Sequence, residues 1–179
     1  KDKAEQLVNN SKLRRTGICG AAETLLIHKN CVESHMPNIL NLLKNGGCEI
    51  RGDETVIENF PDLAKANEDD WKTEYLDSII SVKVVKNVNE AIEHIAKYGS
   101  NHTESIITED INNAELFLNH VSSAIVMHNT STQFADGGEF GLGAEIGIAT
   151  GKLHARGPVG LEGLTTYKYK VRGNGQIRP

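Results

Sequence analysis

The sequence lacks several features that would assign it to a particular class of protein. No apolar run approaches the length of a membrane span, no signal peptide opens it, and its first residue is lysine rather than methionine. It also lacks a basic surplus, since the formal charge is −5 and the isoelectric point is about 5.8. Nucleic acids and anionic membranes select for a basic face, so we expect a cytoplasmic protein that binds neither.

Cysteine is scarce, and its spacing offers no metal site. Cys19, Cys31 and Cys48 are an odd number and form no close pair of the zinc-binding kind. We therefore expect reduced thiols and no bound metal. The chain has 179 residues, of which 39% are hydrophobic and 24% charged, which suits one or two small globular units with a real core.

Apolar periodicity predicts that helices and strands alternate along most of the chain. Helical stripes are expected in the opening residues around Ala4 to Val8, at 32–44, from a cap at Asn89 to Tyr98, and at 111–121. Strands are expected at 23–28, 48–51, 79–85, 104–108, 124–127 and 165–171, with a polar surface connection at 62–70. This alternation predicts an α/β fold with a mostly parallel sheet.

A candidate nucleophile lies in the stretch 14–27. Cys19 stands between Gly17 and Gly20, with Arg14 and Arg15 just upstream, so backbone amides can approach whatever its sulfur attacks. Positive charge and aligned N–H groups lower the pKa of a thiol from its ordinary value of about 8.5. A buried structural cysteine is the alternative, and the local sequence alone leaves both open.

The same stretch resembles the active-site region of the gamma-glutamyl phosphate reductase family, within the aldehyde dehydrogenase superfamily. The resemblance rests on 16–19 with 21–26, and on a second block at 131–132, 134, 136–147 and 152–158; 74–77, 98–100 and 102–104 also match. It implies an aldehyde-dehydrogenase-like catalytic domain at 1–127, a glycine-rich return segment at 128–163 that closes the active site, and an oligomerisation strand at 164–179. It also implies that the N-terminal NADP-binding domain of the family is absent from this chain.

The resemblance implies a reaction of proline biosynthesis that uses NADP(H). A Cys19 thiolate would displace phosphate from gamma-glutamyl phosphate, and hydride from NADPH would reduce the thioester to glutamate-5-semialdehyde. The N–H of Cys19 is a candidate donor to the oxyanion. Glu74 matches the superfamily glutamate that accepts hydrogen bonds from the nicotinamide-side ribose, with Tyr75 beside it. By spacing alone, Glu74 is instead a solvated residue of an acidic stretch.

Four residues are candidates for substrate binding under this resemblance. Gly20 stands where the family usually has asparagine, and Gln133 where an arginine usually follows Ser-Thr. An arginine holds a carboxylate or phosphate by a charged fork, which a glutamine cannot do. Arg156 is either a replacement cation or a surface arginine in a turn, and His102 is either a substrate contact or a surface histidine in its loop.

The glycine-rich block at 136–147 has two interpretations. Gly138, Gly141 and Gly143 could expose amides to an anion. The block is, however, neither a Walker loop nor a dinucleotide fingerprint that follows a strand. By resemblance, its expected role is to close the substrate pocket near the cysteine.

Two other classes of function stay open, and assembly is a separate expectation. The chain could be a non-catalytic relic that serves as an oligomerisation or binding module, or an unrelated hydrolase pairing Cys19 with His28 or His154. Residues 165–171 alternate apolar and charged side chains, as in a strand with two different faces. In the superfamily this terminal segment pairs with a neighbouring subunit, which implies a homodimer.

Overall fold

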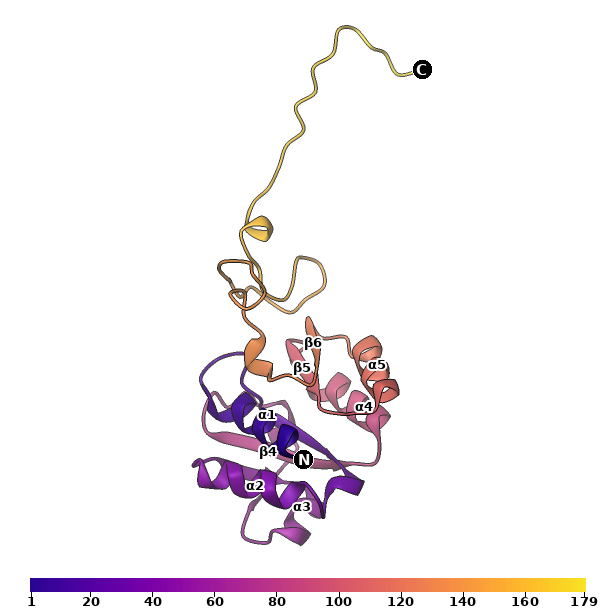
Figure 1. The fold of residues 1–179 in the computed structure, drawn as a ribbon. Helices are drawn as coiled ribbons and strands as arrows, with labels where there is room; N and C mark the ends of the chain where they lie inside the picture. Colours follow the sequence, from indigo (N-terminus) through magenta and orange to yellow (C-terminus); the bar gives the residue numbers. More distant parts are fainter.

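The computed structural model describes residues 1–179 and contains two parallel sheets (Figure 1). The larger sheet has the order β1-β4-β2-β3, and the smaller one pairs β5 with β6. Neighbouring strands in both sheets run parallel. The strands are β1 Thr24–His28, β2 Glu49–Gly52, β3 Ala64–Lys65, β4 Ile79–Val85, β5 Thr103–Ile106 and β6 Ile125–His128. The prediction of an α/β fold with a mostly parallel sheet is thereby confirmed.

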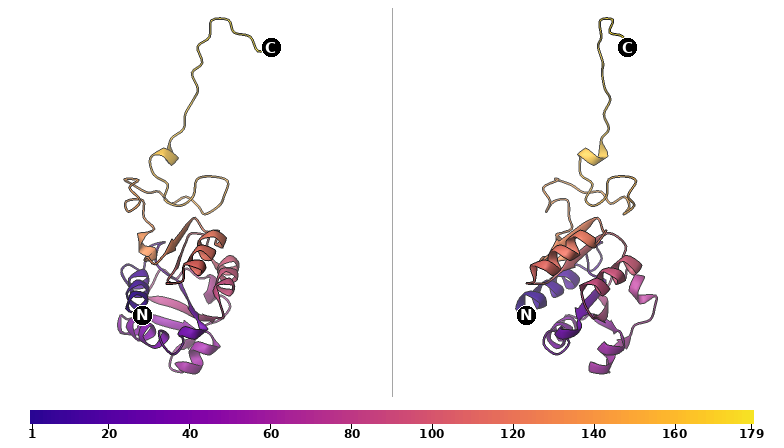
Figure 2. Two further views of the ribbon diagram at one scale, coloured as in Figure 1. Left: turned by 45° about the vertical axis from the view of Figure 1, so that its right-hand side comes forward. Right: turned by 90° about the vertical axis from the view of Figure 1, so that its right-hand side faces the viewer.

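Five α-helices and four short 3-10 turns connect the strands. The helices are α1 Asp2–Leu13, α2 Met36–Asn45, α3 Glu54–Asn59, α4 Val88–Tyr98 and α5 Ile111–His120. The 3-10 turns are η1 Lys29–Cys31, η2 Asp70–Lys72, η3 Thr132–Phe134 and η4 Glu162–Leu164. Helices α4 and α5 lie beside the smaller sheet, and α1 to α3 lie around the larger one (Figure 2). None of the helices is long and apolar enough to cross a membrane.

The main core lies between the larger sheet and helices α1 to α3. Apolar side chains at helical spacing on α2 meet alternate side chains of β2 and β4, as periodicity requires. The buried members are Val8, Ile27, Met36, Ile39, Leu40, Leu43, Cys48, Ile50, Val56, Ile80 and Val82. This packing brings the end of α1 beside the start of β1, where the Ala22 N–H donates to the Ser11 carbonyl at 3.0 Å.

Two predicted helix starts are wrong by a few residues, each for a local reason. Helix α2 begins at Met36 rather than Val32, because Pro37 lies in its first turn, where its missing N–H costs nothing. Asn87 rather than Asn89 caps α4, since its side chain accepts a hydrogen bond from the Glu90 N–H at 3.0 Å.

Two short elements were not predicted. Helix α3 has only six residues and depends on Asp53, which caps it. Strand β3 lies inside the polar connection at 62–70 and pairs only with Arg51 and Gly52 of β2. Both are too short to produce a periodic pattern in the sequence.

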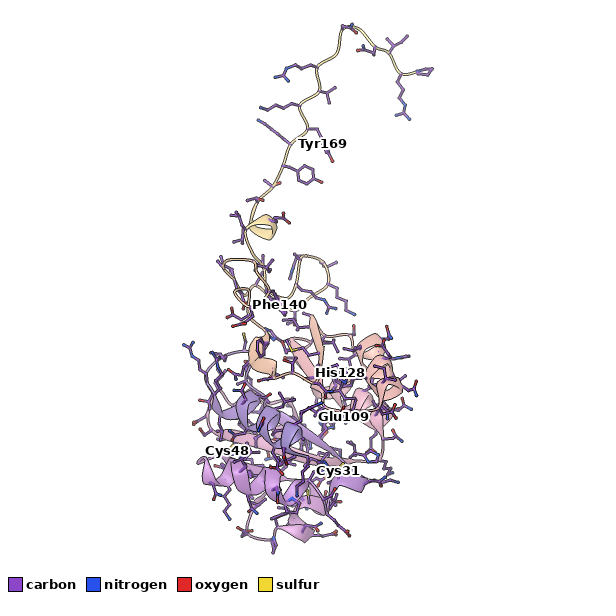
Figure 3. The ribbon with its side chains drawn as sticks, in the orientation of Figure 1. Cys31, Cys48, Glu109, His128, Phe140 and Tyr169 are labelled. Atoms are coloured by element: carbon purple, nitrogen blue, oxygen red, sulfur yellow. The ribbon has the colours of Figure 1, made fainter.

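Residues 165–171, expected as a final strand, have no partner strand within the chain. They are exposed and run away from the folded body, as the place of Tyr169 in Figure 3 shows. The return segment, in which Phe140 is labelled, lies between that body and the extended terminus (Figure 3). The oligomerisation strand therefore stays a prediction.

Substituting Asp53 by alanine should destabilise the fold more than the same change at another helix cap. The Asp53 carboxylate accepts from the Val56 N–H at 3.0 Å and from the Val84 N–H at 2.8 Å, and the residue is 8% exposed. Loss of the cap plus an unpaired buried donor should cost about 2–3 kcal/mol of unfolding free energy.

Asp110→Ala is the matched control, because Asp110 caps the exposed start of α5 through the Asn112 and Asn113 N–H groups. Its expected cost is about 1 kcal/mol. Urea unfolding followed by circular dichroism measures both changes. Equal losses would show that the bond to Val84 contributes nothing.

Candidate active site

The candidate nucleophile lies in a loop that joins α1 to β1, residues 14–23, here called the cysteine loop. Within it, the Ala21 N–H donates to the Ile18 carbonyl at 3.0 Å, and the Cys19 side chain is exposed. Gly20 is buried, and a Cβ there would lie 3.0 Å from the Thr132 carbonyl oxygen. The close approach of η3 therefore favours glycine at the position that the family usually fills with asparagine.

A cleft of about 700 Å³ runs past Cys19. Its walls include β1 and β5, and each of these strands presents an edge that is paired to no other strand. Cys19, Gly20, Glu74 and His102 all line this cleft, although they come from distant parts of the sequence. The fold thus gathers four of the predicted site residues along one cavity.

The pKa of the Cys19 thiol is raised above its ordinary value, contrary to the expectation from the sequence. Burial and the negative charge of Glu145 are the main causes, and the charge of Glu74 adds to them. The backbone N–H groups of Cys19 and Gly20 act in the opposite direction. Neither Arg14 nor Arg15 is among the main groups that act on the sulfur, and the Arg14 guanidinium donates to the Gln133 side-chain oxygen at 3.4 Å.

The other two cysteines lie in different surroundings. Cys48 is 6% exposed in the main core, and burial raises the pKa of its thiol to about 11. Cys31 is half-buried at the end of η1. Figure 3 shows both within the folded body. Cys48 has the setting of a structural cysteine, and Cys19 is the exposed thiol.

Glu74 and Tyr75, both expected to bind cofactor, differ in whether their polar atoms are already hydrogen-bonded within the chain. The Glu74 side chain is exposed, makes no hydrogen bond or ion pair within the chain, and lies close enough to Cys19 to influence its pKa. The Tyr75 hydroxyl donates to Asp70 Oδ1 at 2.7 Å and lies 2.8 Å from Ser81 Oγ. The Tyr75 hydroxyl is therefore already held in the fold, and a cofactor contact by this residue stays a prediction.

Gln133 and Arg156, both expected to bind substrate, direct their polar atoms at backbone carbonyls. The Gln133 amide donates to the carbonyls of Ser11 and Arg15, at 2.9 and 3.1 Å. The Arg156 guanidinium donates to the Ser122 carbonyl at 2.8 Å and lies outside the cleft walls. Both side chains are therefore bonded within the fold, and a substrate contact by either one stays a prediction.

His102 keeps its place in the cleft. Its Nδ1 lies 2.7 Å from Thr103 Oγ1 at the start of β5. Glu104 is the second residue of β5. Burial raises the pKa of its carboxyl group to about 7, and the carboxylate accepts a hydrogen bond from Ser123 Oγ at 3.1 Å. A carboxyl group with a pKa raised toward neutral is common at functional sites. Glu104 lies in the matched stretch 102–104 but was not predicted as a site residue.

A buried ion pair beneath the cysteine loop was also missed. Lys12 is 0% exposed, and its Nζ lies 2.7 Å from Glu23 Oε2. The second oxygen of Glu23 accepts from the Leu76 N–H at 3.2 Å, which ties the loop that carries Glu74 to the cysteine loop. A signal was present in the sequence, because Lys12 follows Val8 at i+4 on the buried face of α1.

Neither histidine proposed as a base for a hydrolase is bonded to Cys19. His28 lies at the far end of β1 from the cysteine loop, and its Nδ1 accepts from the Asn30 N–H at 3.2 Å. His154 is exposed and its Nδ1 lies 2.8 Å from the Ala155 carbonyl. The thiol–imidazole pair that a cysteine hydrolase requires is therefore not formed.

Comparison with known proteins gives consistent results. No protein-family model matches the chain. Gamma-glutamyl phosphate reductases of Parvibaculum lavamentivorans and Allorhizobium ampelinum are 62% and 60% identical to it, over 99% of the chain and 42% of each relative. The chain thus spans less than half the length of these curated relatives.

Solved structures show the same relationship. The crystal structure of gamma-glutamyl phosphate reductase from Thermotoga maritima superposes with a TM-score of 0.94 at 52% identity, over 99% of this chain and 43% of that one. The enzyme from Saccharomyces cerevisiae gives a TM-score of 0.57 at 31% identity, over 98% and 38%. An acetylating aldehyde dehydrogenase from Geobacillus thermoglucosidasius, 16% identical with a TM-score of 0.66 over 98% and 49%, shares the fold.

Alkylation should separate the three thiols in the folded chain. Cys19 is exposed, whereas Cys48 is buried with a pKa of about 11. With iodoacetamide at about pH 8, we expect Cys19 to react first and Cys48 roughly tenfold or more slowly, because the thiolate is the reacting species. Peptide mass spectrometry at several times measures each rate. Equal labelling in the folded chain would contradict this assignment, and labelling in urea should remove the difference.

Proposed function

Because the chain is homologous over nearly its whole length to one portion of the gamma-glutamyl phosphate reductases, we propose that it carries the cysteine chemistry of that reaction. The proposed reaction is the NADPH-dependent reduction of gamma-glutamyl phosphate to glutamate-5-semialdehyde and phosphate in proline biosynthesis. One observation supports it above the others: the exposed Cys19 thiol lies in a cleft, at the position that the homologous region gives it.

The first step uses groups that this chain supplies. The Cys19 thiolate attacks the acyl carbon of gamma-glutamyl phosphate, a C–S bond forms, and the C–O bond to phosphate breaks as phosphate leaves with the electron pair. The N–H groups of Cys19 and Gly20 are proposed to stabilise the oxyanion of the tetrahedral intermediate. The raised pKa of Cys19 keeps the resting thiol largely protonated near neutral pH, so a rise in pH should favour this step.

In the second step the thioester carbon is reduced. A nicotinamide cofactor, proposed to be NADPH, would supply the hydride when bound. With the hydride on the acyl carbon, the C–S bond would break with its electron pair on sulfur, releasing the aldehyde and returning Cys19 as the thiolate. Glu74 fits the proposed cofactor contact, because its carboxylate is exposed beside Cys19, has no partner within the chain, and can accept from two adjacent hydroxyls. His102, in the same cleft, stays a candidate for substrate contact.

The division of the chain is part of the same proposal. Residues 1–127 would form the catalytic domain, 128–163 the return segment, and 164–179 the oligomerisation strand. The proximity of Glu145 to Cys19 supports a return segment that closes on the thiol. The non-catalytic alternative is favoured by Gln133, whose amide is used within the fold and cannot replace the substrate contacts of an arginine.

Acyl transfer to Cys19 tests the proposed chemistry without cofactor. Gamma-glutamyl phosphate, generated in situ from glutamate and ATP by a glutamate kinase, should add one glutamyl group to Cys19. Mass spectrometry of the intact chain and its peptides detects the adduct. Cys19→Ser should abolish it, and Cys31→Ser is the matched control that should retain it. A chain that acquires no adduct while Cys19 remains alkylatable would favour the non-catalytic module.

NADPH oxidation with the same substrate, with and without a separately supplied cofactor domain, then tests the complete reaction. We expect isolated NADPH affinity to be poor, weaker than about 1 mM, because Glu74 and a few loop amides cannot replace a whole nucleotide-binding fold. Micromolar binding in calorimetry would overturn that expectation.

The extended C-terminus is proposed to pair with a second copy of the chain. Tyr167, Tyr169 and Val171 are exposed side chains on a segment with unpaired backbone groups, which an edge strand of another subunit can satisfy. Deleting residues 164–179 should therefore shift the protein from dimer to monomer in analytical ultracentrifugation. An intact chain that sediments as a monomer at high concentration would disprove this assembly.

A further inference from the structure

We propose that Gln133 is a positioning residue, whose side-chain amide holds the cysteine loop against the return segment and thereby fixes the surroundings of Cys19. The inference rests on Cys19 being the nucleophile of the proposed function. It assigns Gln133 a different task from the substrate contact expected at this position.

The Gln133 amide uses both of its ends. Its Nε2 donates to the Ser11 carbonyl at 2.9 Å and to the Arg15 carbonyl at 3.1 Å, and its Oε1 accepts from Arg14 Nη1 at 3.4 Å. The residue is 6% exposed, so these partners are not exchanged for water at low cost. One side chain from η3 therefore binds the backbone where α1 ends and the cysteine loop begins.

The Ser11 carbonyl accepts two hydrogen bonds. It belongs to the last turn of α1, whose carbonyls have no partner within the helix. It accepts from the Ala22 N–H at 3.0 Å as well as from Gln133, so the end of the cysteine loop and η3 meet at this oxygen. Loss of the Gln133 amide would leave the Ser11 carbonyl with Ala22 alone and remove a donor from the Arg15 carbonyl, which favours rearrangement of the loop.

Further contacts align η3 with the same site. Ser11 Oγ donates to Ser131 Oγ at 3.2 Å and accepts from the Thr132 N–H at 3.2 Å. Gly20 lies so close to the Thr132 carbonyl that a Cβ would be 3.0 Å from it. Thus η3 contacts the cysteine loop at its start and immediately after Cys19.

The return segment beyond η3 carries the charge that acts on the thiol. The Gly137 N–H donates to the Glu145 carboxylate, which folds the segment back on itself and places this carboxylate near Cys19. Gln133 lies before this bend in the chain and binds the return segment to α1 and the cysteine loop. Loosening the anchor should therefore separate Cys19 from Glu145 and from the atoms that bury it.

The test compares the alkylation profile of Cys19 in variants of the complete 179-residue chain. Gln133→Met keeps the length of the side chain but removes its hydrogen bonds, and Gln133→Glu replaces the donor by an acceptor that faces two carbonyls. Gln6→Met and Gln6→Glu are matched controls at an exposed position of α1. Iodoacetamide rates at Cys19 are measured from about pH 7 to about pH 10, together with urea unfolding.

Gln133→Met should shift the Cys19 profile of alkylation rate against pH toward that of an ordinary thiol, to lower pH. Gln133→Glu adds a negative charge, which raises the pKa of a nearby thiol, so this variant is compared for urea unfolding only. The labelling rate of Gln133→Met at about pH 8 should rise by roughly threefold for each unit by which the pKa falls, because tenfold more thiolate is partly offset by its weaker nucleophilicity. Glu145→Gln is the reference, since removing its charge alone should move the profile in the same direction. The Gln6 variants should leave it unchanged.

An unchanged Cys19 profile combined with a lower urea midpoint would reduce Gln133 to a purely structural role and overturn the inference. Global unfolding of both variants would overturn it as well, because Gln133 would then support the fold as a whole. The measurement requires no reductase activity. Failure of the proposed function would appear instead as missing acyl transfer in the unmodified chain, so the two failures are distinguishable.

Discussion

The buried ion pair between Lys12 and Glu23 joins the three segments on which the candidate site depends. Lys12 closes α1, Glu23 ends the cysteine loop, and the second oxygen of Glu23 holds the segment that carries Glu74. Because Lys12 is completely buried, its charge has no access to water, and loss of Glu23 would leave that charge uncompensated at a cost of about 3–5 kcal/mol. The pair adds little net stability against an apolar replacement, but it favours one arrangement of the three segments.

Much of the fold could be predicted from the sequence because its longer elements bury one face. Strands such as β4 are dense in β-branched residues, and α2 carries an apolar stripe, so both appear as periodic patterns. The starts of α2 and α4 were less predictable. The start of α2 depends on Pro37, which lacks an N–H donor, and the start of α4 depends on the single hydrogen bond that the Asn87 side chain accepts. Helix α3 was missed since its six residues depend on Asp53, whose second bond reaches Val84 in a different strand.

The candidate site could be predicted only in part, since resemblance identifies residues but not their neighbours. It selected Cys19 and Glu74, which the fold brings to one cleft. The predicted direction of the Cys19 pKa was wrong because adjacent arginines in the sequence suggested a positive setting, whereas burial and the negative charges of Glu145 and Glu74 raise this pKa in the fold. The bonds of Tyr75 and Gln133 were invisible for the same reason, as their partners are set by tertiary packing.

The unpaired edges of β1 and β5 have a mechanical consequence for the cleft between them. No backbone ladder joins the two sheets, so a change in their separation breaks no sheet hydrogen bond. The exposed ion pair of Lys3 and Glu109 at 2.5 Å bridges the two sides but contributes at most about 1 kcal/mol. The buried bonds of Ser11 with Ser131 and Gln133 join α1 to the segment that follows β6. The relative position of the two sheets is therefore held by these few contacts, whereas the register within each sheet is held by a backbone ladder.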